Sequence, residues 1–592
     1  MSAPSTAGEA NPTASAPPRR WLTPERLGLG ACLALFVLGT AVRLYVAAQG
    51  VESPGIDENE VVEQAVAFMG GDLRYYFLKY GPLTMYALAG IYHVAALLHG
   101  VTALEYASRV FFEGAEHYAI ARFYVVGWLS VLALCAFFGF RRHSGVGAAL
   151  IALVLLAYPV VEVLSPGARI DIPQAAFQGL ALVALSEVVR SGRLRYWLLA
   201  GACAGLAIAT KPLPGLLVIP CFIAAAWFAS ALPGEAARPW STRLWAAASG
   251  KGLWLAALAC VACAALGNPA ILDISSFIQS QREAVTLHSG HALAARAEIG
   301  DSLRRLGIPF LVLGAGSALL VLVRRDARGL LYGLFIAVYL AALWGRASRD
   351  YFLVAPAAAG CLLIARGWAL LGELAASALA RGWTHAGSFL AGLTWPKATA
   401  WICFALVIAM GPVRSAEARA TKPNPSTEAR DWIESHVPSG SRIFHVGWRP
   451  SGPLLVATDE KVQARWGDHF DYGREKYAFL KQAFHLGYSN YMASDEPRYR
   501  IDVYDGRPTS RASKQTPRWV TDKLLANAQK DKTAYIILAG YRERDYTELG
   551  YRWFADAQVA AEFRKITIFK VPAPTPVALT SGTPPAPPAP AP

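Results

Sequence analysis

The chain has 592 residues, of which 54% are hydrophobic and only 17% are charged, and its formal net charge is +14. Soluble domains carry about 25% charged residues, so this composition excludes an ordinary soluble protein and indicates a polytopic membrane protein. The basic residues are spread over short loops, which argues against a nucleic-acid partner and fits cytoplasmic loops beside anionic membrane lipids.

The N-terminal segment, residues 1–24, is rich in Ala, Ser and Pro at its start, and we expect it to be disordered and cytoplasmic. Arg19, Arg20 and Arg26 precede the first apolar run, 27–48. A cleavable signal peptide has a similar charge pattern. The run is long enough to span a membrane, so we interpret it as an uncleaved first helix that begins in the cytoplasm.

An acidic stretch follows this first helix. From Glu52 to Lys79 there are six acidic residues and only two bases, and Asp57 and Glu58 are adjacent within it. A dense acidic patch beside a hydrophobic helix, in a basic protein, is a candidate site of chemistry. The alternative is a solvated acidic loop that stays outside the membrane because positively charged loops stay inside.

Eleven further apolar runs lie near 82–99, 121–140, 145–163, 172–189, 196–210, 213–231, 252–271, 306–323, 329–344, 351–371 and 398–413. The positive-inside rule assigns the basic clusters at 141–143, 190–195, 238–251 and 324–328 to the cytoplasm. This assignment requires that 82–99 does not cross the membrane. We therefore place 82–99 as an interfacial or re-entrant helix in one long external loop, 49–120. The transmembrane domain, 25–413, then has about eleven crossings, and residues 414–592 lie outside.

Residues 414–571 are more polar than the preceding part of the chain. A helix is predicted at 427–433, and strands are predicted at 441–446, 534–538 and 566–571. This alternation indicates a small extracytoplasmic α/β domain. The Pro/Ala-rich segment 572–592 is expected to be a disordered tail.

The predicted topology collects polar residues at helix ends on the external face. Charges at membrane depth cost roughly 2.5–3.5 kcal/mol each on insertion scales, so a convergent set suggests a functional site. The set consists of Asp57, Glu58, Lys79, Arg169, Asp171, Lys211, His288, His291, Arg346 and Arg349.

Several short motifs follow one another in a characteristic order. They are Asp57-Glu58, Lys79-Tyr80-Gly81-Pro82-Leu83, Arg169-Ile170-Asp171-Ile172-Pro173, Gly201 to Gly205 leading into Ala209-Thr210-Lys211, and Arg349-Asp350-Tyr351 near Pro356. This order resembles the lipid-linked-sugar glycosyltransferases of the GT-C superfold. Over roughly residues 25–360, the chain is most similar to the protein O-mannosyltransferases and the lipid A aminoarabinose transferases.

The resemblance implies an inverting glycosyltransferase of the inner (cell) membrane with an external active site. Its donor would be a sugar linked to polyprenyl phosphate, and its acceptor a glycan, a lipid or a protein. The resemblance leaves a divalent metal as an open question. The alternative is a lipid-linked-sugar flippase or transporter, which would show an internal repeat and charges near the middle of helices; we find no such repeat.

The resemblance also implies residue roles. Asp57 would be the general base, Glu58 the neighbouring acid and Asp171 the acid of the second external loop. The donor phosphate would be held by Lys79, Lys211, Arg346 and Arg349, and the further substrate-binding candidates are Tyr80, Arg169, His288 and His291. Relatives often have a lysine directly before two prolines, whereas here Tyr80-Gly81 separates Lys79 from Pro82.

Simpler interpretations exist for some of these residues. Arg169 and Asp171 could form an ion pair that caps the helix at 172–189, and Lys211 could extend its ammonium to a membrane interface. His288 and His291 could bind a metal. Cys260-Val-Ala-Cys263 has metal or redox spacing, but Ala and Leu surround it, so we interpret it as part of a small-residue helix interface.

Overall fold

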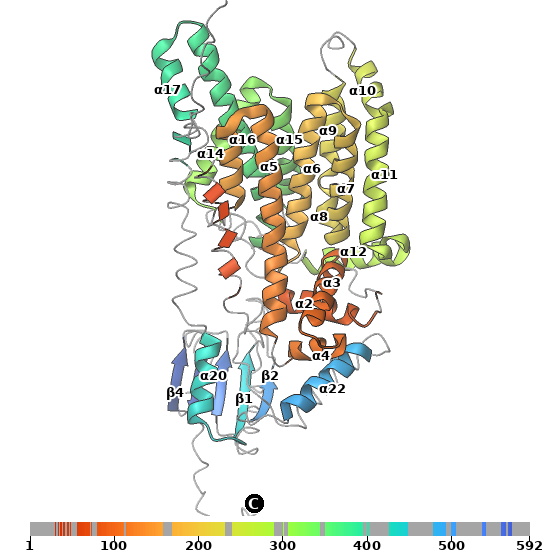
Figure 1. The fold of residues 1–592 in the computed structure, drawn as a ribbon, viewed down its shortest axis with the longest axis vertical. Helices are drawn as coiled ribbons and strands as arrows, with labels where there is room; N and C mark the ends of the chain where they lie inside the picture. The colour runs from red at the N-terminus through yellow and green to blue at the C-terminus, as the bar shows by residue number, and fades with distance from the viewer. Residues whose placement is uncertain are drawn as a thin grey trace, which may run out of the picture.

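The computed structural model describes residues 56–71, 73, 80–111, 114–157, 168–230, 239–288, 306–343, 350–394, 425–447, 478–492, 499–504, 535–539, 558–563 and 566–570, with single positions between 30 and 48 and at 300, 303, 398, 399 and 402. The described residues form a bundle of long helices with short helices and a small sheet at one end (Figure 1).

The bundle consists of α5 (Ala115–Ala157), α6 (Asp171–Ser191), α7 (Leu194–Thr210), α8 (Pro212–Leu216), α9 (Ile219–Ala229), α10 (Trp240–Ser249), α11 (Lys251–Gly267), α14 (Ile308–Arg324), α15 (Ala327–Leu343), α16 (Val354–Ala380) and α17 (Thr384–Thr394). Within the described residues, four helical segments are long and apolar enough to cross a membrane, or five if α10 and α11, bent by 42°, form one span. Four further apolar helices are shorter. The prediction of about eleven crossings extends beyond the described residues and stays a prediction.

Helix α5 contains two of the predicted apolar runs, 121–140 and 145–163. Gly145 separates its two parts with φ 87° and ψ 166°, outside the helical region. Glycine adopts positive φ without the steric cost that a side chain imposes. The chain therefore changes direction at Gly145, where the sequence predicted a boundary between two runs.

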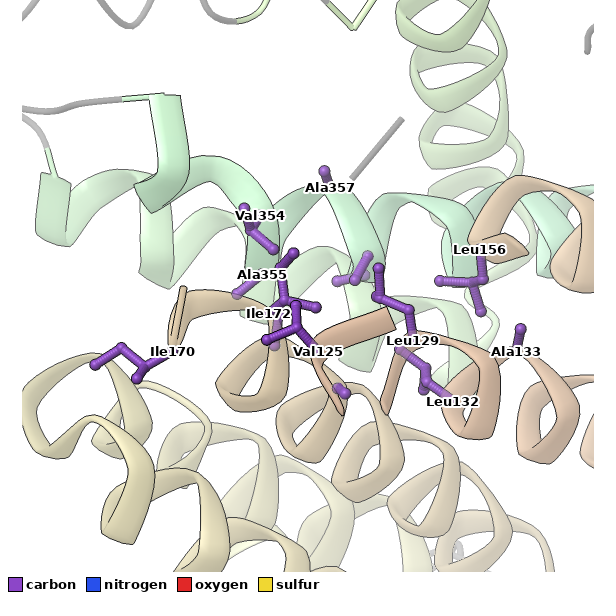
Figure 2. Close-up of a cluster of buried hydrophobic side chains, with 14 of the residues drawn as sticks. Val125, Leu129, Leu132, Ala133, Leu156, Ile170, Ile172, Val354, Ala355 and Ala357 are labelled. Carbon is purple, nitrogen blue, oxygen red and sulfur yellow. The ribbon is translucent and has the colours of Figure 1, made fainter. Parts of the chain in front are cut away.

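The centre of the bundle is α16, which is almost completely buried between Val354 and Leu370. Its first turns are rich in alanine, and small side chains let neighbouring helices approach closely. Figure 2 shows Val354, Ala355 and Ala357 beside Val125 and Leu129 of α5. The start of α6 also contributes to this core.

The interface between α7 and α11 depends on glycine. A Cβ atom at Gly201 would lie 2.1 Å from the Ala256 carbonyl oxygen, and one at Gly205 would lie 2.3 Å from that of Cys260. Cys263 Cβ is 2.8 Å from the same Gly205 position. This contact confirms the interpretation of the Cys260–Cys263 segment as part of a closely packed helix interface.

Short helices cover one end of the bundle: α2 (Ile56–Phe68), α3 (Leu83–Leu98), α4 (Ala103–Ser108) and η1 (Arg109–Phe111). A capping box starts α4, in which Thr102 and Glu105 satisfy each other's backbone N–H groups. Helix α3 packs against α2 and α4 and lies at the end of the bundle rather than beside the long helices (Figure 1). This position agrees with the non-crossing placement of 82–99. At the same end, η3 (Pro269–Leu272) leads from α11 into α12 (Ile274–His288).

The C-terminal part contains α20 (Pro425–His436), α22 (Ala478–Met492) and a five-stranded sheet in the order β2-β1-β3-β5-β4. The strands are β1 (Arg442–Gly447), β2 (Arg500–Tyr504), β3 (Tyr535–Ala539), β4 (Gln558–Phe563) and β5 (Ile566–Lys570). Strand β1 pairs in parallel with β2 and β3, and β5 pairs antiparallel with β3 and β4. The predicted strands correspond to β1, β3 and β5, whereas β2 and β4 were not predicted.

Helix α22 packs against α4. The Cβ that Gly70 lacks would lie 2.5 Å from Phe479 Cβ on α22, so α2 and α22 are also in close contact. The C-terminal sheet consequently lies at the same end of the bundle as α2–α4 (Figure 1). The topology predicted from the sequence places the sheet and α2–α4 on the same side of the membrane. That this side is extracytoplasmic stays a prediction.

Candidate active site

Residues from four separate segments meet at the end of the bundle where α2–α4 lie. Lys211 Nζ is 2.6 Å from Asp171 Oδ1, and each side chain is only 8% exposed. The same ammonium lies 5.6 Å from the ring centroid of Tyr80 and 4.7 Å from that of Phe352. The structure therefore brings together three of the predicted site residues, Tyr80, Asp171 and Lys211, and adds Phe352 to them.

The local sequence explains how Lys211 and Asp171 are placed. Lys211 ends α7 with an extended backbone (φ −150°, ψ 100°), and Pro212 begins α8. A residue before proline is driven out of the helical region, so the Lys-Pro pair breaks the helix here. Asp171 begins α6, where the positive end of the helix dipole stabilises a carboxylate.

Gly81 brings the segment before α3 against the end of α7. Its N–H donates a hydrogen bond to the Thr210 carbonyl at 3.0 Å. A Cβ at Gly81 would lie 1.7 Å from the Ala209 carbonyl oxygen, so no other residue fits without moving the backbone. The Tyr80-Gly81 pair, which departs from the pattern of the relatives, thus allows the close approach that places Tyr80 near Lys211.

The interfacial position proposed for Lys211 is wrong. Lys211 is 6% exposed and ion-paired, whereas a lysine that extends to an interface keeps its ammonium in water. In the described part of the chain, Asp171 forms its ion pair with Lys211, so the capping pair between Arg169 and Asp171 is not supported. A buried ion pair is weak evidence for stability, because desolvation offsets the attraction, and in a membrane protein it points to function.

Glu58 is buried and makes a different set of contacts. Both of its carboxylate oxygens accept hydrogen bonds from Arg122, with Nη2 at 3.0 Å from Oε2. The Ala168 N–H donates to Oε1 at 2.9 Å. Glu58 thus holds α2 against α5 and against the segment just before Asp171.

Two kinds of residue at this end were missed by the sequence analysis. Arg122 lies at the start of the apolar run 121–140, and an ionisable residue within such a run was the available signal. Gln174 and Gln178 on α6 form a buried amide pair at 2.8 Å, and Gln178 donates to the Pro214 carbonyl at 2.7 Å. Nothing in the local pattern of α6 indicated these glutamines.

Several predicted residues cannot be placed. Lys79, His291, Arg346 and Arg349 lie outside the described residues. Asp57 and His288 belong by their backbones to α2 and α12, but their side chains are outside the described part. Arg169 is partly buried. Among the residues that the structure describes, no three His, Cys, Asp or Glu side chains form a group that could hold a metal ion.

A sequence model of the family described as dolichyl-phosphate-mannose-protein mannosyltransferase matches residues 108–236. This segment contains Arg122, Asp171 and Lys211. The match confirms the resemblance to lipid-linked-sugar glycosyltransferases over that part of the chain. No curated protein sequence matches the chain.

Solved structures with similar arrangements are known. ArnT from Cupriavidus metallidurans, in the apo state and bound to undecaprenyl phosphate, is 13% identical in each case, with a TM-score of 0.47. The alignments cover 92% of this chain and 98% and 97% of those chains. The oligosaccharyltransferase of Archaeoglobus fulgidus in its apo form is 13% identical, with a TM-score of 0.41, over 86% of this chain and 69% of that chain.

Proposed function

We propose that this protein is an inverting membrane glycosyltransferase that moves a sugar from a polyprenyl-phosphate-linked donor to an extracytoplasmic glycan, lipid or protein. The observation that supports it most is the buried Lys211–Asp171 pair between two aromatic rings. It lies within the segment that matches the mannosyltransferase family.

The donor phosphate would bind at Lys211. An ammonium presents three N–H donors, so it can hold Asp171 and a phosphate oxygen at the same time. Because the site is buried, a cation stabilises the charge on a departing phosphate more strongly than it would in water. Lys79, Arg346 and Arg349 are proposed to complete the phosphate site, and Arg169, Tyr80, His288 and His291 are the further candidates for substrate binding.

Asp57 is proposed as the general base. The acceptor hydroxyl oxygen forms a bond to the anomeric carbon, and its proton passes to the Asp57 carboxylate. The bond from the anomeric carbon to the phosphate oxygen breaks with its electron pair, so polyprenyl phosphate leaves from the opposite face. Glu58, anchored to Arg122 and Ala168, would hold the start of α2 in position for this step.

The first experiment measures transfer directly. Purified full-length protein is incubated in detergent with labelled lipid extract, and the release of polyprenyl phosphate is followed together with the labelled acceptor. A glycosyltransferase releases the lipid phosphate in detergent. A flippase or transporter does not, because it breaks no bond, and unchanged donor lipid after binding would overturn the proposal.

Asp57→Asn tests the general base. The amide keeps the size of the side chain but cannot take the acceptor's proton, so turnover should fall by about 100-fold or more. Donor binding should persist, because the proposed phosphate site is unchanged. Turnover close to that of the parent would return the acidic stretch to a charged external loop.

A further inference from the structure

Helix α6 carries a stripe of buried polar residues that starts at the candidate active site. Asp171, Gln174 and Gln178 are spaced by three and four residues, so they lie on one face of the helix. They are 6%, 1% and 0% exposed. Because α6 is long and apolar enough to cross a membrane, a buried amide there must be satisfied by other protein groups rather than by water. The partners of the two glutamines therefore indicate what the stripe holds.

The two glutamines form a chain of hydrogen bonds that ends outside α6. Gln174 Nε2 donates to Gln178 Oε1 at 2.8 Å, and Gln178 Nε2 donates to the Pro214 carbonyl of α8 at 2.7 Å. At the start of the same helix, Asp171 Oδ1 accepts a hydrogen bond from Lys211 Nζ at 2.6 Å. Helix α6 thus holds the junction of α7 and α8 at two points, the side chain of Lys211 and the backbone three residues after it.

Two prolines, Pro212 and Pro214, interrupt the helical hydrogen bonds at this junction. In a continuous helix, the residue at position 214 would donate to the Thr210 carbonyl, but proline has no N–H. The Thr210 carbonyl instead accepts from the Gly81 N–H at 3.0 Å. Lys211 itself is extended rather than helical, with φ −150° and ψ 100°. The orientation of α8 relative to α7 therefore depends in part on contacts from other elements.

We propose that Gln178 is a positioning residue for Lys211, because it holds the first turn of α8 against α6 through the Pro214 carbonyl. Gln174 fixes which end of the Gln178 amide faces α8, since its N–H donor selects the amide oxygen. Without the bond to Pro214, α8 can shift against α6 and carry Lys211 away from Asp171, because α8 begins directly after Lys211. The consequence for transfer rests on the proposed function, in which Lys211 meets the donor phosphate.

The reactivity of Lys211 toward a small amine reagent tests the proposal without a substrate. Full-length protein in detergent is treated with formaldehyde and cyanoborohydride, and the methylation rate of Lys211 is measured by peptide mass spectrometry. Gln178→Met keeps an unbranched side chain but can make neither hydrogen bond. It should raise the rate by about five-fold, the factor that corresponds to losing one hydrogen bond of average net strength. A rate equal to that of the parent would overturn the proposal.

Ser186→Ala is the matched control. Ser186 is also buried on α6, but its hydroxyl donates to the Val183 carbonyl of the same helix at 2.8 Å, so Lys211 should be methylated at the parent's rate. Equal increases in Ser186→Ala and Gln178→Met would mean that any loosening of α6 exposes Lys211, and would overturn the proposal. If Gln178→Met does not fold, Gln174→Met decides. It removes only the bond that orients Gln178 and should raise the rate by at least about two-fold; an unchanged rate would overturn the proposal.

Transfer kinetics connect the position of Lys211 to the proposed function. In Gln178→Met, the donor KM should rise by about five-fold while the acceptor KM stays unchanged, because the displaced cation is the one proposed to meet the donor phosphate. A purely structural defect would instead reduce the amount of folded enzyme, and thus kcat, with both KM values unchanged; this result would overturn the positioning role. If the parent releases no polyprenyl phosphate, the proposed function fails, whereas the methylation rates still decide whether Gln178 holds Lys211.

Discussion

Asp57 and Glu58 are neighbours in the chain, and the structure describes the side-chain contacts of Glu58. Glu58 is 3% exposed and is occupied by Arg122 and the Ala168 N–H. The carboxylate oxygens of Glu58 are committed to three hydrogen bonds, two from Arg122 and one from Ala168, which leaves little room for an acceptor hydroxyl beside them. At the residue scale, these contacts favour an anchoring role for Glu58, whereas Asp57 is the residue proposed as the general base.

Glu58→Gln tests this difference. The amide removes the negative charge that faces the partly buried Arg122, so the free energy of unfolding should fall by about 1–3 kcal/mol. Turnover should fall less than in Asp57→Asn. Thermal unfolding and turnover are compared, and the double variant Glu58→Gln/Arg122→Gln should regain part of the lost stability. A complete loss of turnover with unchanged unfolding would make Glu58 itself a reacting group.

The Lys211–Asp171 pair permits a double-mutant cycle. Lys211→Met or Asp171→Asn alone leaves one buried charge uncompensated, which typically costs about 3–5 kcal/mol. The double variant should be closer to the parent in unfolding free energy. Its donor turnover should stay low, because the cation proposed to meet the phosphate is gone. Recovery of both stability and turnover would show that the pair is only structural.

At the scale of elements, the candidate site depends on how closely the loop before α3 approaches α7. Gly81 contacts the backbone of Ala209 and Thr210 directly, and Gly267 of α11 packs against Ala209 from another side. The break in the helix at Lys211-Pro212 would place Lys211 at the end of α7 even without the contact at Gly81. Only the close approach at Gly81 brings Tyr80 to it.

Gly81→Ala should disturb this approach, with Gly90→Ala as its control. The added methyl group would overlap the Ala209 carbonyl, so we expect a loss of at least about 1–3 kcal/mol, the usual cost of overpacking. Gly90 lies on an exposed face of α3 with open space around it, and alanine there should stabilise the helix by about 0.5–1 kcal/mol. Thermal unfolding in detergent compares the two. Equal shifts would contradict the contact at Gly81.

At the scale of the whole molecule, charges divide between the two ends of the bundle. His143, Glu187 and Arg190 meet at one end, as the predicted cytoplasmic assignment of their clusters requires. The helices α2–α4, α22 and the sheet occupy the other end (Figure 1). The two ends thus have the separation that the topology requires, with the sidedness still to be measured.

Reporter fusions test that sidedness. A fusion after Arg142 should report the cytoplasm, and one after Pro425 should report the external compartment. The expectation rests on a non-crossing α3, because a crossing there would invert every later loop. If both fusions report the same compartment, the predicted parity of crossings is wrong.

The sequence by itself predicted the class of protein, most helix positions and three of the five described strands. It also identified Asp171 and Lys211 as candidate site residues. These features depend on hydropathy, charge and breaker residues within a few positions, such as Lys211-Pro212. Such signals are local, so they can be interpreted without the fold.

The pairings were decided only by the tertiary structure. Lys211 and Asp171 are 40 residues apart, Glu58 and Arg122 are 64 apart, and Glu58 and Ala168 are 110 apart. A charged residue does not specify its partner, because several opposite charges were equally available in the sequence. The packing of α5, α6 and α7 against the short helices determines these pairings. A buried charged group can pair only with a group that the fold places within reach.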